Sequence, residues 1–305
     1  MCKRTLIIMT TFQRYQHIQR LDNDNVEVQG LLDGPVYVQP KIDGTNTSVW
    51  REEDGIHFGK RSQAMGDGDD NRGVKAKYQN DQRYIDFFNE HPDVILYGEW
   101  LVKHTISTYL ADAWNKLYIF DVCREDEDGN IKEWIPYEEY SAWLDKYGIE
   151  YVPVFAYLTK PTIDALMEYV ENNHYLLPEN QVGEGIVIKR YDYVNPYGRT
   201  TWGKIVRSAF KAKAHAPFKG NEDSVEAQIV EDLFTPEFVL KEYAKIKEIP
   251  GLDSKTIIPR TIATIPYVFI TEEIGTILKK YKKPTIDFKK LGRLCESRVK
   301  EYLGW

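Results

Sequence analysis

Short runs of alternating apolar and polar residues recur along the first two-thirds of the chain and stop before residue 225. Period-two alternation is typical of strands that bury one face. The runs are rich in β-branched and aromatic residues and predict strands at 36–40, 46–50, 56–61, 94–100, 116–122, 185–190 and 202–206. Glu53-Asp54-Gly55 predicts a hairpin turn between the second and third of these strands. Short helices are predicted at 12–20, 84–89, 137–146 and 162–173.

The pattern changes after Lys213. The stretch AHAPFKGNEDS, residues 214–224, mixes Pro, Gly and polar residues and is typical of a linker. Beyond it the apolar residues follow the spacing of amphipathic helices, both in 225–247 and in the last stretch of the chain, residues 291–303. We therefore predict an α+β body at 1–213, with mixed and antiparallel sheets, and a small all-α domain at 225–305.

The charge of the chain is unevenly distributed. Its net charge is -7 over 305 residues, so the molecule as a whole is not a polycation. Residues 189–219 nevertheless carry eight Lys or Arg against one acid, and residues 279–300 carry nine against two. Such runs are either solvated faces or patches that bind nucleic acid phosphates.

The three cysteines, Cys2, Cys123 and Cys295, match neither a metal-binding spacing nor a disulfide framework. A reducing compartment is expected, either the cytoplasm or, for a viral protein, the host cytoplasm. No apolar run is expected to span a membrane. The basic, acid-free first twenty residues leave an organellar leader open.

The first strand ends in KIDG, with Lys41, Asp43 and Gly44. A lysine can attack phosphorus once it has lost a proton, and neighbouring cations or a metal favour its neutral form. By itself this motif is weak evidence for a catalytic lysine, because an ordinary surface turn can have the same sequence. Further segments follow in a fixed order, and each would be ordinary if it stood alone: GKRSQ (59–63), LYGEW (96–100), YIFDV (118–122), EGIVIK (184–189) and WGKIV (202–206).

Taken together in this order, the segments resemble the motifs of the covalent nucleotidyltransferases, the polynucleotide ligases and messenger-RNA capping enzymes. Asn46, in KIDGTN, stands where DNA ligases and capping enzymes have arginine and resembles the bacteriophage RNA ligase 2 type. A helical tail also fits that type better than the β-barrel of the other families. Three alternatives stay open: a small DNA ligase, a non-catalytic protein that binds nucleic acid ends, and a guanylyltransferase.

The resemblance implies an ATP-dependent RNA ligase. Lys41 would carry AMP from ATP, pass it to a 5′-phosphate, and the 3′-hydroxyl of the adjoining strand would then displace it. The implied substrate is a nicked RNA duplex or a pair of bridged RNA ends. The protein is expected to act as a monomer and to have no membrane partner. Mg²⁺ or Mn²⁺ is the implied metal, held by Asp43 and Glu184.

The resemblance also assigns the remaining roles. Lys189 and Lys204 would reach the phosphates as catalytic cations, Glu99 would bind the ribose, and Phe120 would stack on adenine. The full nucleotide-binding set is Gln39, Lys41, Asn46, Arg61, Glu99, Phe120, Glu184, Lys189 and Lys204. The alternatives are strand-end ion pairs for Glu99 and Glu184, a core position for Phe120, and a solvated charge for Lys189. The sequence departs from the family at Val206, where a second lysine is usual, so Arg207 or Lys211 would supply that charge.

Overall fold

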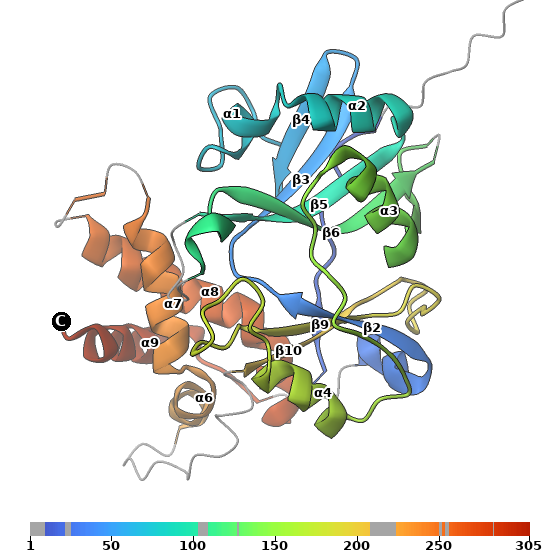
Figure 1. Ribbon diagram of the computed structural model, residues 1–305. Helices are drawn as coiled ribbons and strands as arrows, with labels where there is room; N and C mark the ends of the chain where they lie inside the picture. The colour runs from blue at the N-terminus through green and yellow to red at the C-terminus, as the bar shows by residue number, and fades with distance from the viewer. Residues whose placement is uncertain are drawn as a thin grey trace, which may run out of the picture. The chain divides into compact units, whose positions relative to one another are not determined.

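We describe a computed structural model of the chain (Figure 1). It describes residues 10–21, 26–102, 109–126, 128–207, 224–249, 252–253, 256–282 and 284–305. These residues form two compact units. The larger unit comprises Met1–Gln19, Val26–Val102 and Tyr109–Lys204, as far as these are described. The smaller unit comprises Arg20–Asn25, Lys103–Thr108 and Ile205–Trp305, with the same restriction.

One sheet of the larger unit has the order β4-β3-β5-β6-β7, and its pairings along this order are antiparallel. Its strands are β3 (Thr45–Glu52), β4 (Gly55–Lys60), β5 (Val94–Leu101), β6 (Lys116–Glu125) and β7 (Ile131–Trp134). The predicted hairpin is confirmed: Glu52 pairs with Gly55, whose φ is positive. A register shift at Tyr97/Gly98 lies between β5 and β6.

The second sheet has the order β1-β10-β9-β2-β8. Its strands are β1 (Gln19–Arg20), β2 (Pro35–Lys41), β8 (Ala156–Thr159), β9 (Gly185–Lys189) and β10 (Gly203–Val206). β2 is its central strand and pairs antiparallel with β8 on one side and β9 on the other. Directly paired residues share a face, so Gln39 and Lys41 of β2 lie on the same face as Val187 and Gly185 of β9.

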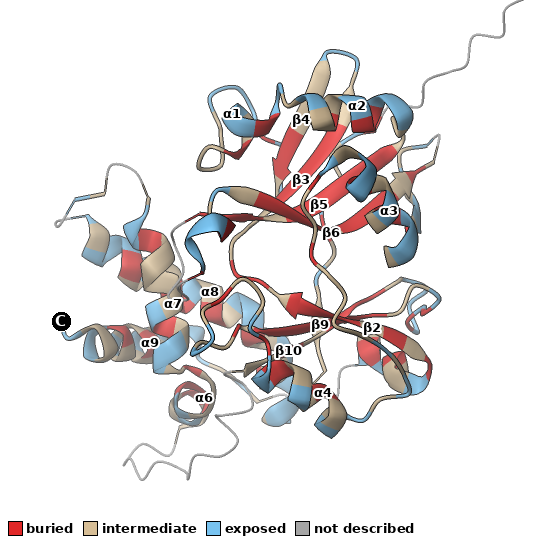
Figure 2. Cartoon of the chain, viewed as in Figure 1, coloured by how far each residue is buried: buried red, intermediate tan, exposed pale blue. Residues whose placement is uncertain are grey.

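Helices cover the outer faces of both sheets (Figures 1 and 2). α1 (Val74–Tyr78), α2 (Gln82–Glu90) and α3 (Tyr137–Tyr147) pack on the sheet of β3–β6, and α4 (Ile163–Glu171) lies against β9. The 3-10 turns are η1 (Val26–Val28), η2 (Leu31–Asp33) and η3 (Ala111–Ala113). A further cluster that includes Trp50, Tyr97, Val187 and Trp202 joins the inner faces of the two sheets. Gln39 and Lys41 share the face of Val187, which belongs to this cluster, and Phe120 packs against it.

The smaller unit is helical, as predicted, with α6 (Val225–Leu233), α7 (Pro236–Lys247), α8 (Ile257–Lys280) and α9 (Phe288–Leu303). Ser224, Thr235 and Asp287 cap α6, α7 and α9 by accepting backbone N–H hydrogen bonds. The prediction that no apolar run could span a membrane needs correction, because α8 is long and apolar enough by length and composition. A core helix meets the same criterion, and Ile265, Phe269 and Ile277 of α8 are buried in the helical cluster.

The structure changes the prediction for the N-terminal region. Residues 12–20 do not form the predicted helix: they run without regular structure into β1, because their side chains and backbone make contacts far along the chain, such as Gln19 N–H with Trp202 O at 3.0 Å. The short elements α1, β7 and β8 were not predicted. Residues 208–223 are outside the described part of the chain. The predicted linker, residues 214–224, therefore lies outside it except for Ser224, and so does the predicted boundary after Lys213.

Candidate active site

Lys41 is the last residue of β2 and lies directly opposite Gly185, the first residue of β9. This register brings the Lys41 amine to Glu184, the residue before β9, with Nζ 2.6 Å from Oε2. Both side chains keep some exposure, 22% for Lys41 and 13% for Glu184. The predicted nucleophile therefore has a carboxylate at hydrogen-bond distance and remains accessible to a ligand.

Two hydrogen bonds fix the turn that follows Lys41. The Asp43 backbone N–H donates to the Tyr109 hydroxyl at 2.8 Å, and the Gly44 N–H donates to Glu99 Oε1 at 2.9 Å. A Cβ at Gly44 would lie 2.6 Å from the Trp100 carbonyl oxygen, so no larger residue fits there without a shift. Asn46 is paired with Glu99 across β3 and β5, and the chain thereby places both next to the turn.

Tyr109 is a site residue that the sequence analysis missed. Tyr109 is buried, and this burial, together with the charges of Asp43, Glu184 and Glu99, raises its pKa well above the ordinary value. No local sequence motif indicates a role for this tyrosine, because the role depends on a contact with Asp43, 66 positions away in the sequence.

Replacing Tyr109 with phenylalanine should slow the adenylylation predicted for Lys41. The ring would stay, but the Asp43 N–H would lose its buried acceptor, which costs about 1–3 kcal/mol. We expect the rate of adduct formation at Lys41 in a single turnover with ATP to fall about tenfold. Tyr118→Phe is the matched control, since its buried hydroxyl, in the same apolar cluster, donates to the Ala113 carbonyl oxygen. Equal rates for both variants and the wild type would contradict this role.

Phe120 and Asp121 lie on β6, where a buried ion pair fixes them. Lys189 Nζ lies 2.8 Å from Asp121 Oδ1 and donates to the Phe120 carbonyl oxygen at 2.5 Å. Asp121 Oδ2 accepts further hydrogen bonds from Tyr15 and Trp202. Burial raises the pKa of Asp121, whereas these donors oppose the shift by stabilising its carboxylate.

The ion pair changes the interpretation of Lys189. With 1% of its surface exposed, Lys189 is not a solvated strand-end charge, and its predicted contact with the phosphates stays a prediction. Its amine holds the backbone beside Phe120. The Phe120 ring is partly buried. Its burial is thus intermediate between the two predictions, a core residue and an exposed ring that stacks on adenine.

Gln39 connects the same site to the helix layer. It is 2% exposed, and its Nε2 donates to the Tyr140 hydroxyl at 3.1 Å and to the Val152 carbonyl oxygen at 3.0 Å. Tyr140 in turn donates to the Phe120 carbonyl oxygen at 3.1 Å. Within the described part of the chain, Gln39 Oε1 and Asn46 Oδ1 are buried acceptors that no protein donor satisfies. Both atoms therefore suit donors supplied by a bound ligand.

The RNA ligase family model matches residues 34–213. The chain belongs to the RNA ligase family. The matched region contains all of the predicted site residues, and it excludes the N-terminal segment and the helical unit from α6 onward. No curated protein matches the sequence.

The fold of this RNA ligase family member is found in solved structures. An RNA ligase from Naegleria gruberi, determined with PPi, aligns at 19% identity and a TM-score of 0.50 over 67% of this chain. The chain spans about three-fifths of that ligase, 59% of its length. An Aquifex aeolicus protein assigned as an ATP-dependent DNA ligase aligns at 16% identity and a TM-score of 0.49, over 96% of this chain and 66% of that one. The first match shows the nucleotidyltransferase fold.

Arg61 and Lys204 are two further residues of the predicted set. Arg61 is exposed just after β4, with Nη2 2.9 Å from His17 Nδ1 of the N-terminal segment. Lys204 is half-buried on β10, and Val206 ends that strand. Of the candidates for the second cation, Arg207 is described and half-buried, whereas Lys211 lies outside the described residues.

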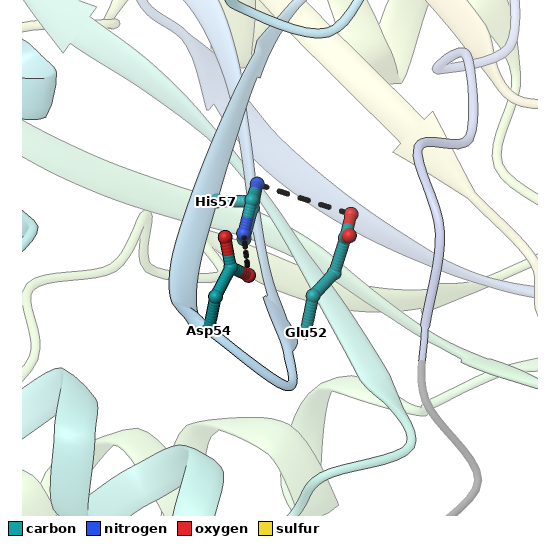
Figure 3. A group of neighbouring side chains, drawn as sticks. All are labelled: Glu52, Asp54 and His57. Atoms are coloured by element: carbon teal, nitrogen blue, oxygen red, sulfur yellow. Dashed lines mark hydrogen bonds and ion pairs between the residues drawn. The ribbon is translucent and has the colours of Figure 1, made fainter.

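A separate group of possible metal ligands lies on the β3–β4 hairpin (Figure 3). Glu52, Asp54 and His57 have ligand atoms within 4.8 Å of one another. His57 Nε2 lies 2.7 Å from Asp54 Oδ1, and this contact lowers the pKa of Asp54. The three side chains satisfy one another at the surface, and none belongs to the predicted site.

Proposed function

We propose that this chain is an ATP-dependent RNA ligase that joins a 3′-hydroxyl to a 5′-phosphate through an adenylate on Lys41. The observation that carries the proposal is the Lys41–Glu184 contact of 2.6 Å beside the Asp43–Gly44 turn, in a member of the RNA ligase family. A protein that only bound nucleic acid ends would need neither a lysine at this place nor a carboxylate beside it.

In the first step, Lys41 Nζ would attack the α-phosphorus of ATP. An N–P bond forms as the bond from that phosphorus to the pyrophosphate oxygen breaks, and pyrophosphate leaves. The amine must lose a proton, and Glu184 Oε2 lies at the distance needed to accept it. The Naegleria gruberi ligase that shares the fold was determined with PPi. Phe120 offers a partly exposed ring for the adenine, and Glu99 offers a carboxylate for the ribose hydroxyls.

The residues around the turn fit a divalent cation. Mg²⁺ and Mn²⁺ prefer carboxylate oxygens, and Asp43 and Glu184 supply them next to the reacting lysine. When bound there, the cation would offset the negative charge of the phosphates. Asp43 is 6% exposed, and its backbone N–H donates to the Tyr109 hydroxyl.

In the second and third steps, the adenylate would pass to the RNA. The 5′-phosphate oxygen attacks the lysyl adenylate, and the N–P bond breaks to regenerate Lys41. The 3′-hydroxyl then attacks the activated 5′-phosphorus, and AMP leaves as the new phosphodiester forms. Arg61 and Lys204 would supply the positive charge that these phosphates need.

The helical unit has a basic face suited to the RNA backbone. Lys289, Arg293 and Lys300 are exposed on one side of α9, which also carries the half-buried Glu296, so three cations stand against one acid there. Phosphate contacts of this kind bind a duplex independently of its base sequence. They also make binding weaken steeply as salt rises.

Sealing of nicked duplexes tests the proposed function. We expect ATP-dependent joining at a nick with RNA on the 3′-hydroxyl side, and a loss of joining of about tenfold or more between 50 and 200 mM salt. Nicks with DNA on that side provide the comparison, because faster joining there would favour a DNA ligase. If the protein joins no end although it binds ATP and RNA, the proposal is wrong.

A further inference from the structure

The N-terminal segment, residues 10–19, lies across the inner face of the larger unit. It precedes residue 34, where the match to the family model begins, so family membership assigns it no role. Three contacts tie down its backbone or side chains: Thr11 N–H donates to Glu125 Oε2 at 2.9 Å, Gln13 Nε2 donates to the Gly129 carbonyl oxygen at 2.6 Å, and Gln19 N–H donates to the Trp202 carbonyl oxygen at 3.0 Å. An extended segment held along its length can place side chains reproducibly.

Two of its side chains reach the predicted nucleotide site. Tyr15 is 4% exposed, and its hydroxyl donates to Asp121 Oδ2 at 2.5 Å. Its ring lies edge-on to the Phe120 ring, with 5.1 Å between the centroids. The second side chain is His17, whose Nδ1 lies 2.9 Å from Nη2 of Arg61, a residue of the predicted nucleotide-binding set. Tyr15 therefore touches Phe120 directly and, through Asp121, also the residue next to it.

The hydrogen bonds around Asp121 explain how Tyr15 would act. Asp121 Oδ2 has two donors, Tyr15 and Trp202, while Lys189 faces Oδ1. A hydrogen bond to a buried carboxylate is among the stronger ones in proteins. Without the Tyr15 hydroxyl, Asp121 and Lys189 would relax, and with them the backbone of Phe120, whose carbonyl oxygen accepts from Lys189.

We propose that Tyr15 is a positioning residue of the nucleotide site, which holds Phe120 in the orientation that stacks on the adenine of ATP. This inference rests on the proposed function, because it assumes that ATP binds next to Lys41. It extends the site beyond the region that the family model matches to the N-terminal segment. Tyr15 would act on base binding, without touching the phosphates or the reacting amine.

Tyr15→Phe tests this role, because it keeps the ring and removes only the hydroxyl. We expect the KM for ATP in adduct formation at Lys41 to rise about tenfold, with the rate at saturating ATP nearly unchanged. Inorganic tripolyphosphate, which has no base, should inhibit the variant as well as it inhibits the wild type. A general loosening of the fold would weaken the binding of both molecules.

Tyr97→Phe is the matched control. Tyr97 is buried in the same aromatic cluster, with its ring 4.9 Å from that of Tyr15, and its hydroxyl donates to the Gln13 carbonyl oxygen at 3.2 Å without reaching Asp121. Its KM for ATP should stay near the wild-type value. An unchanged KM in Tyr15→Phe, or an equal rise in both variants, would overturn the inference.

A second measurement uses the wild-type protein alone, so it does not depend on the folding of a variant. ATP without metal should slow hydrogen exchange at the amides of residues 10–19, because a stacked base would stabilise the contacts of Phe120 and Tyr15. Unchanged exchange there, with slower exchange in β6, would overturn the inference. Failure of the wild-type protein to form any adduct with ATP and Mg²⁺ would instead count against the proposed function.

Discussion

Replacing Lys41 with alanine should abolish the covalent adenylate. The variant lacks the attacking nitrogen, so adduct formation with labelled ATP and Mg²⁺ should fall by at least about a thousandfold, as it does when a nucleophile is removed from other enzymes. Intact-mass analysis and gel labelling both measure the adduct. The cost to folding should be small, because Lys41 keeps 22% exposure and the strand around it is unchanged.

The same variant separates the first step from the last. A strand that already carries the 5′-adenylate needs no lysyl intermediate, so Lys41→Ala should still seal it in part. Lys41→Arg is the control for charge: it keeps a cation beside Glu184 but has no amine able to attack at neutral pH. An adduct that persists in Lys41→Ala would place the nucleophile elsewhere and would refute the proposed mechanism.

Replacing Lys189 with methionine should cause a large loss of stability. The change would leave the Asp121 carboxylate buried without its cation, and breaking a buried pair in this way costs about 3–5 kcal/mol. For a domain of this size we expect the Tm to fall by about 10 °C. Calorimetry or circular dichroism on the full chain measures it.

Lys146→Met is the matched control for this prediction. The Lys146–Glu90 pair is also short, at 2.6 Å, but it lies at the surface with both side chains about half exposed. Water and salt screen such a pair, so its loss should change the Tm little. The double variant Asp121→Asn with Lys189→Met should be more stable than Lys189→Met alone, since it buries no unpaired charge. Equal Tm losses for Lys189→Met and Lys146→Met would show that burial does not control the strength of the pair.

Much of the larger unit could be predicted from local patterns. The alternation in VYVQPK and in TNTSVWRE predicts strands β2 and β3, and the β-branched and aromatic residues of VILYGEWL predict β5, which is buried on both faces. The hairpin at Gly55 and the helices from 225 onward follow from turn chemistry and helical spacing. The predicted helix at 12–20 was wrong because contacts with Asp121, Arg61 and Trp202 determine that segment.

The sequence by itself determined the α+β body with its helical tail, and the order of motifs that identifies the family, because both depend on residues close together along the chain. Only the tertiary structure decided what the charged residues do. Lys189 binds Asp121, 68 positions away, and Tyr109 supports the turn at Asp43, 66 positions away. The role of a charge depends on its burial and on its partner, and both are set when distant strands pack together.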